Sequence, residues 1–133
     1  QRIEAAQLLA QDLEIDILLK GAPSAILSAA GETILGSTVC SALSTAGSGD
    51  VLTGMVAGLV AQGSTLNNAA IAGCELHVIC GELAAASIGE RSVIAPDLLN
   101  FISAAFKFVD DDTSGQTHKE NGSSCSHDGS CQC

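Results

Sequence analysis

The chain has 133 residues and a formal net charge of −10, and only 2% of its residues are aromatic. This charge makes nucleic acid and anionic membrane surfaces poor partners, and the scarcity of aromatic rings argues against a protein that stacks single-stranded bases. Hydrophobic residues make up 47% of the chain, so a packed core of Ala, Leu, Ile and Val is expected.

The first part of the chain predicts a helix followed by three short strands. Residues 2–14 carry apolar side chains at helical spacing. The stretch IDILLKG, residues 15–21, predicts a buried strand. The stretch SAILSAAGETILGS, residues 24–37, predicts two short strands joined by a turn that contains glycine.

The second part predicts three helices. Residues 49–62 are apolar nearly all round, which is typical of a buried helix. Residues 64–87 predict a long helix that begins at Ser64 or Thr65. Residues 95–109 predict a last amphipathic helix with proline in its first turn.

Residues 110–133 differ from the rest in composition: they are rich in Ser, Gly, Asp and Cys and have few apolar residues. We expect a disordered tail, because such a segment cannot bury enough surface to offset its ordering entropy. Cys125, His127, Cys131 and Cys133 could bind Zn²⁺ or Cu⁺. The alternative is a solvated tail without metal.

The order of the predicted helices and strands indicates the fold class. Alternating helices and strands indicate an α/β fold, yet three strands are few for this much buried helix. The chain also begins at Gln1 without Met, inside a predicted helix, so an N-terminal half is expected to be missing.

No secretory signal is visible, and the apolar run of residues 51–61 is too short to span a bilayer. We therefore expect a cytoplasmic protein that acts away from membranes.

A glycine turn precedes the apolar helix at residues 49–62. Gly47 and Gly49 allow a ligand to approach the main chain, and the free N–H groups of the helix start favour an anion such as a phosphoryl group. Asp50 is placed to accept a proton or to help hold Mg²⁺. Alternatively, Asp50 only caps the helix and the glycines only permit the turn.

The string LSTAGSGDVLTGMVAGLVAQG, residues 43–63, resembles the ribokinase-like ADP/ATP-dependent NAD(P)H-hydrate dehydratases, in which a run like LATAGSGDVLTGIIAGLLAQG is the most distinctive segment. Upstream, RIEAAQLLAQDLEIDILLKGAPSAI is similar to the family's helix, strand and LKGA-x-T segment. Downstream, AAIAGCELHVICGELAAASIGERSVIAPDLL is similar to its LHG and ASDL patterns. The resemblance implies that residues 1–109 form the C-terminal part of a dehydratase domain with a three-layer αβα fold.

The resemblance also implies a set of site residues. Asp50 matches the family's substrate-contacting aspartate, with a role as base on the hydroxyl of hydrated NADH or NADPH. The nucleotide, ADP or ATP with Mg²⁺, would be bound by two segments: Lys20, Gly21, Ala22, Pro23 and Ser24, and Thr45, Ala46, Gly47, Ser48 and Gly49. Lys20 is the only Lys or Arg between residues 3 and 90.

Departures and alternatives remain open. The family often has Asn-Pro-Gly or Asn-Pro-Ala before the glycine motif, where this chain has Cys-Ser-Ala at residues 40–42, and Pro96 replaces the Ser of ASDL. The same anion site would also serve a ribokinase-like small-molecule kinase, for example of a thiamin precursor. A third alternative is an inactive nucleotide-binding or metal-binding fragment. His77 is expected to be a partly buried helical histidine rather than a substrate or metal contact, and a homo-oligomer is an open expectation.

Overall fold

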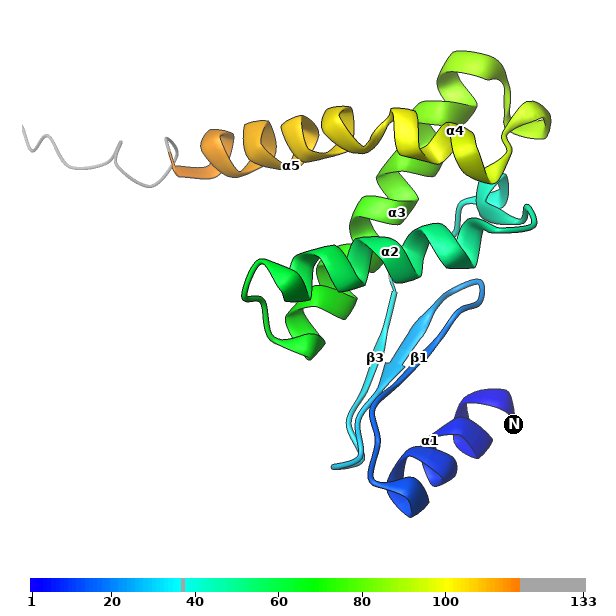
Figure 1. The fold of residues 1–133 in the computed structure, drawn as a ribbon, viewed down its shortest axis with the longest axis vertical. Helices are drawn as coiled ribbons and strands as arrows, with labels where there is room; N and C mark the ends of the chain where they lie inside the picture. Colours follow the sequence, from blue (N-terminus) through cyan, green and yellow to red (C-terminus); the bar gives the residue numbers. More distant parts are fainter. Residues whose placement is uncertain (37, 118–133) are drawn as a thin grey trace, which may run out of the picture.

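The computed structural model describes residues 1–36 and 38–117. In this part the chain forms five α-helices, three strands and two 3₁₀ helices. In chain order they are α1 (Arg2–Leu13), β1 (Ile17–Leu19), β2 (Ala25–Leu27), β3 (Thr33–Leu35), η1 (Ser41–Leu43), α2 (Ser48–Ala61), α3 (Leu66–Ile88), η2 (Glu90–Ser92), α4 (Ala95–Asn100) and α5 (Ile102–Thr117). The predicted order of helix, strands and helices is confirmed (Figure 1).

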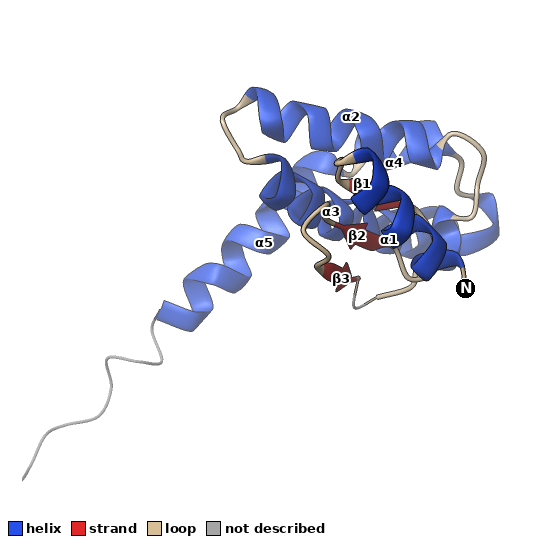
Figure 2. Ribbon diagram, turned by 90° about the horizontal axis from the view of Figure 1, so that it is seen from below, coloured by secondary structure: helices blue, strands red, loops and turns tan. Residues whose placement is uncertain are grey.

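The three strands form one antiparallel sheet in the order β1-β2-β3, with helices on both faces. Ala25 and Leu27 on β2 are buried together with Ala10 of α1. Successive side chains of a strand point to opposite faces, so Ile26, which is 9% exposed, faces the other side, where α3 contacts β2. Figure 2 shows the strands between α1 and the remaining helices. This is the expected three-layer α/β/α arrangement.

A second core lies among the helices. Four of its eight buried members are alanine or cysteine, and these small side chains let the helices approach one another closely. Its buried members are Ala42, Leu43, Leu76, Cys80, Ala84, Val93, Leu98 and Ala105. They come from η1, α3, α4, α5 and the loop before α4, so α3 is the central helix of this cluster (Figure 1).

The long helix α3 begins as predicted, because the Thr65 side chain accepts a hydrogen bond from the Asn68 N–H. By length and composition alone α3 could cross a membrane, which differs from the expectation that the chain's longest apolar run is too short. A core helix of a soluble protein has the same properties. The buried side chains of α3, which include Leu76, Cys80 and Ala84, pack in the helical core.

The prediction of one last helix over residues 95–109 is wrong in two respects. First, the structure has a break at Phe101, which divides this stretch into α4 and α5. The Asp97 carboxylate caps the start of α4 by accepting a hydrogen bond from the N–H of Ile94. α5 then continues to Thr117, past the predicted boundary at residue 109. Adding residues to an existing helix costs far less than starting one, so the polar residues after Val109 extend it. Residues 118–133, including the cysteines of the tail, lie outside the described residues.

Candidate functional site

The N-terminus of α2 has the geometry of an anion-binding turn. Gly47, at the N-cap position, has φ +84°, in the left-handed region that glycine adopts without a steric cost. A Cβ at this position would also lie 3.2 Å from the Cβ of Ala95. The turn is closed by hydrogen bonds from the Ser48 N–H to the Thr45 carbonyl (3.3 Å) and from the Asp50 N–H to the Gly47 carbonyl (3.0 Å).

Two backbone N–H groups at this turn remain available. In residues 1–36 and 38–117, the N–H groups of Gly47 and Gly49 have no backbone acceptor. Such free donors, at the positive end of the helix dipole, favour a bound anion. The backbone donors that the predicted anion hole needs are therefore unpaired at this turn, and the binding of an anion there stays a prediction.

Lys20, which lies directly after β1, is brought against this turn by the fold. Its Nζ donates to the Leu43 carbonyl (3.4 Å), and the Ser48 Oγ donates to the same carbonyl (2.7 Å). The methylene stem of Lys20 runs along Gly49, because a Cβ on Gly49 would lie 3.4 Å from the Lys20 Cδ. The two predicted nucleotide-binding segments therefore meet at Lys20 and Gly49.

The Gly21–Ser24 turn lies beside Lys20 and is mostly exposed. The Ser24 Oγ donates to the Gly21 carbonyl (3.3 Å) and accepts from the Gly21 N–H (3.4 Å), so it closes the turn. The sequence did not indicate that Arg2 supports this turn, where its Nη2 atom donates a hydrogen bond to the Lys20 carbonyl (2.7 Å). The only signal in the sequence is that Arg2 is one of five basic residues. Ala22 and Pro23 are exposed at the tip of the turn.

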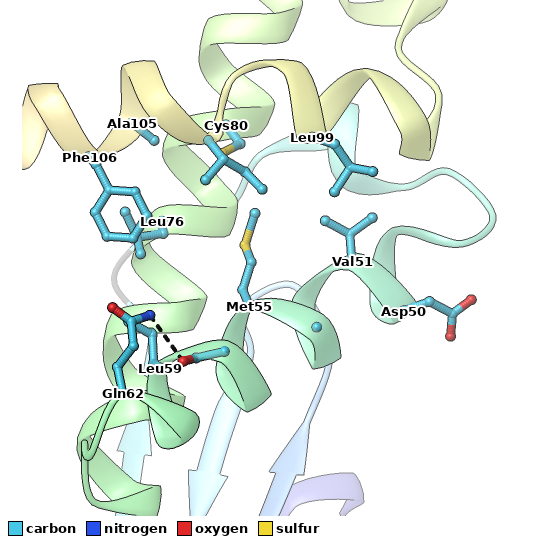
Figure 3. Close-up of a pocket in the computed structure, with 13 residues that line it drawn as sticks. Asp50, Val51, Met55, Leu59, Gln62, Leu76, Cys80, Leu99, Ala105 and Phe106 are labelled. Carbon is cyan, nitrogen blue, oxygen red and sulfur yellow. Dashed lines mark hydrogen bonds between the residues drawn. The ribbon is translucent and has the colours of Figure 1, made fainter.

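Asp50 lies in the first turn of α2 and is exposed. Figure 3 shows its carboxylate pointing away from the apolar side chains that line the neighbouring pocket. A carboxylate in this place is accessible to a ligand and lies next to the free N–H groups of the turn. The structure therefore allows the role of a base on a bound hydroxyl.

The loop before the turn borders a small polar pocket of about 270 Å³. Thr45, half-buried, and Ser44 contribute to it, whereas Ala46 is exposed. The Ser41 hydroxyl donates to the Glu90 carboxylate across this pocket. The Cys-Ser-Ala segment that departs from the family pattern therefore takes part in the wall of this pocket, through Ser41 and Ala42.

A larger, apolar pocket of about 510 Å³ lies between α2, α3, α4 and α5. In Figure 3, Val51 and Met55 point into it from α2, and Phe106 and Leu99 from the opposite side. Cys80 also lines it, and burial raises the pKa of this thiol to about 11. Asp50 is at one end of the pocket, but no other lining residue is charged, so the pocket itself offers no partner for phosphate.

His77 is more deeply buried than predicted, with 3% of its surface exposed. Its pKa lies below the ordinary value because of burial and, next, the charge of Lys20, while a hydrogen bond with the Ser48 backbone acts in the opposite direction. Its Nε2 atom has no hydrogen-bond partner among the described residues. A buried polar atom in this state costs about 1–3 kcal/mol. The sequence did not indicate that His77 adjoins the glycine turn.

No group of three or more His, Cys, Asp or Glu residues that could hold a metal ion is found in the described part of the chain. Cys40, Cys74 and Cys80 are free thiols there. The predicted tail ligands, Cys125, His127, Cys131 and Cys133, lie outside the described residues.

Comparison with known proteins agrees with this geometry. The family model Carb_kinase, NAD(P)H-hydrate dehydratase, matches residues 1–104. The chain is 44% identical over 101 residues to the "Bifunctional NAD(P)H-hydrate repair enzyme Nnr" of Salinibacter ruber, covering 76% of this chain and 19% of that protein. It is 32% identical over 109 residues to the "ADP-dependent (S)-NAD(P)H-hydrate dehydratase" of Cenarchaeum symbiosum, covering 82% and 37%.

A solved structure of a dehydratase also matches this chain. The ADP/ATP-dependent NAD(P)H-hydrate dehydratase from Bacillus subtilis, co-crystallised with ATP and Mg²⁺, superposes with a TM-score of 0.75 at 30% identity, covering 80% of this chain and 39% of that one. The chain thus spans about a fifth of the length of the bifunctional relatives and about two fifths of this structure. It belongs to the NAD(P)H-hydrate dehydratase family.

Proposed function

We propose that the chain forms the nucleotide-binding and proton-accepting part of a hydro-lyase that uses ADP or ATP with Mg²⁺ to restore hydrated NADH or NADPH to NADH or NADPH. The observation that carries the proposal is the meeting of Lys20 with the Gly47–Gly49 turn beside an exposed Asp50. A cation, free N–H groups and a carboxylate are the groups that phosphoryl chemistry needs. The names of the relatives and the ATP/Mg²⁺ in the neighbouring structure support this assignment.

Each residue has a distinct role in this proposal. The N–H groups of Gly47 and Gly49 and the ammonium of Lys20 bind the nucleotide phosphates. Asp50 takes the proton from the hydroxyl group of the hydrate as the oxygen of this group attacks the terminal phosphoryl group of the nucleotide, which loses AMP from ADP or ADP from ATP. The oxygen then leaves as phosphate, and loss of a proton from the neighbouring ring carbon restores the double bond. Mg²⁺, which usually keeps waters and is held by phosphates and one or two carboxylates, fits the phosphate site beside Asp50 and would neutralise phosphate charge.

Asp50→Asn tests the proposal directly. We expect the protein that contains this sequence to restore the near-ultraviolet absorbance of NADH from hydrated NADH when ADP or ATP and Mg²⁺ are present. Asp50→Asn should abolish turnover and keep nucleotide binding, because the anion site is made of backbone N–H groups and Lys20. Asp12→Asn, which removes an exposed carboxylate on α1, is the matched control and should keep full activity.

The outcomes separate the alternatives. No recovery of absorbance, while a known dehydratase succeeds in the same assay, would contradict the proposal. A phosphorylated alcohol that accumulates as a stable product would instead indicate the kinase. Binding of Zn²⁺ that is lost on deletion of residues 118–133, without nucleotide binding, would indicate a metal-binding fragment. A cytoplasmic location, assembly as a homo-oligomer and the absence of nucleic-acid or membrane partners remain predictions.

A further inference from the structure

The small polar pocket of about 270 Å³ lies directly beside the turn at Gly47–Gly49. Thr45 lines this pocket, and its carbonyl accepts the hydrogen bond from the Ser48 N–H that closes the turn. The volume is just below the range of about 300–1,000 Å³ that is typical of sites for whole small molecules. The pocket therefore fits one part of a ligand whose remainder lies at the turn.

The wall of the pocket that η2 forms is fixed by two kinds of contact. The Ser41 hydroxyl of η1 donates a hydrogen bond to the Glu90 carboxylate of η2. Behind the pocket, Leu43 of η1 packs in the same buried core as Val93, which follows η2. Because η1 and η2 are held together in this way, Arg91 lines the pocket from the side of η2.

Three side chains that line the pocket have donors to spare. Among residues 1–36 and 38–117, the Arg91 guanidinium has no hydrogen bond or ion pair, and the hydroxyl groups of Ser44 and Thr45 have no hydrogen bond. Arg91 does not pair with the neighbouring Glu90, because successive residues of a 3₁₀ helix project in different directions. A guanidinium and two hydroxyl groups are donors suited to a phosphate group.

Glu90 adds an acceptor to the same pocket. An ionised carboxylate only accepts hydrogen bonds, and one of its two oxygens is left after the bond from Ser41. This carboxylate would repel a simple anion while Arg91 attracts it. A ligand that combines a phosphate group with hydroxyl groups can use both side chains, and ribose phosphate is such a group.

We propose that this pocket is a ribose-phosphate subsite, in which Arg91, Ser44 and Thr45 bind the phosphate and Glu90 accepts hydrogen bonds from hydroxyl groups of the sugar. Both compounds of the proposed reaction contain this group: ADP or ATP, and hydrated NADH or NADPH. The inference rests on the proposed function for these two sources of the ligand, and not for the chemistry of the pocket.

Replacement of Arg91 tests the phosphate contact and identifies its source. Arg91 is exposed, so Arg91→Gln should not disturb the fold. In calorimetric titration of the protein that contains this sequence, we use ADP and NADPH, which has the same ribose phosphates as its hydrate. We expect Arg91→Gln to weaken binding of at least one of them about tenfold to a hundredfold, which is typical of losing hydrogen bonds from a charged group. The compound that loses more affinity is the one whose ribose phosphate occupies the pocket.

Lys107→Gln is the matched control, because it removes the same charge from an exposed side chain on α5, and it should leave both affinities unchanged. Arg91→Lys should keep part of the affinity, since an ammonium still attracts phosphate but lacks the bidentate geometry of a guanidinium. If Arg91→Gln leaves both affinities unchanged, or weakens them no more than Lys107→Gln does, the inference is overturned.

A second measurement depends on neither compound. In ¹H–¹⁵N spectra of the protein titrated with ribose 5-phosphate, we expect the Nε–H resonance of Arg91 and the amide resonances of Ser44 and Thr45 to shift. In Glu90→Ala, the preference for ribose 5-phosphate over inorganic phosphate should fall, because the acceptor for the sugar is lost. An Arg91 resonance that does not respond, or an unchanged preference in Glu90→Ala, would overturn the inference. If ribose 5-phosphate binds here but the protein does not restore NADH from its hydrate, the proposed function fails and the subsite stands.

Discussion

Gly73→Ala tests how closely α2 and α3 pack. The added Cβ would lie 2.7 Å from Val56 Cγ2 and 3.6 Å from the Val56 Cα and N atoms. Val56 is β-branched and lies within a helix, where one χ1 rotamer strongly dominates, so its methyl group cannot turn away cheaply. The two helices have to move apart.

Two opposing effects set the magnitude. Overpacking of a tight contact costs about 1–3 kcal/mol, whereas replacing Gly by Ala within a helix contributes about 1 kcal/mol of stability. The difference predicts that Gly73→Ala lowers the free energy of unfolding by about 1 kcal/mol. Gly58→Ala is the control, because a Cβ there meets no atom within 4 Å, and it should raise the free energy of unfolding by up to about 1 kcal/mol.

Urea unfolding followed by circular dichroism measures both variants, and parallel m-values show that the comparison is valid. The two substitutions should move the midpoint in opposite directions. If Gly73→Ala stabilises the chain as much as Gly58→Ala does, the close approach of α3 to α2 is wrong.

Three further predictions concern the site and its supports. Lys20→Ala should weaken ADP binding about tenfold to a hundredfold in calorimetry, as expected for one charge-assisted hydrogen bond; an unchanged affinity would remove Lys20 from the site. Thr65→Ala should lower the free energy of unfolding by about 1 kcal/mol, because α3 loses its N-cap; no change in urea unfolding would show that water replaces the hydroxyl. Since the folded-state pKa of His77 is lowered, the unfolded chain takes up the proton first, so stability should fall as pH drops below about 6.5; the same pH dependence in His77→Gln would exclude this cause.

The elements that the sequence predicted well have a strong local signal. The α2 and α3 runs are long and apolar, and the β2–β3 hairpin has a glycine in its turn. The break at Phe101 was not predictable, because the amphipathic spacing continues through it and the end of α4 depends on tertiary packing. The extension of α5 to Thr117 was missed for the opposite reason, since its acidic residues carry no apolar periodicity.

The features of the candidate site also differ in whether the sequence predicts them. The turn before α2 and its unpaired N–H groups followed from Gly47 and Gly49 alone, because backbone donors depend on local conformation. The contact of Lys20 with Gly49 and Leu43 joins segments far apart in the chain, so from the sequence it rested on family resemblance. The Arg2 hydrogen bond to the Lys20 carbonyl and the proximity of His77 to Ser48 have no local signature at all.

The position of Lys20 has a mechanical consequence. It follows β1, whose side chains pack with α1 in the sheet core, and its ammonium contacts Leu43, which belongs to the separate helical core. A phosphate held jointly by Lys20 and the α2 turn would therefore cross-link two separately packed cores. At a hundred times its dissociation constant, a nucleotide bound in this way would raise the free energy of separating the two cores by about 2.7 kcal/mol. Without nucleotide, we expect the contact between the two cores to be the first part of the chain to open.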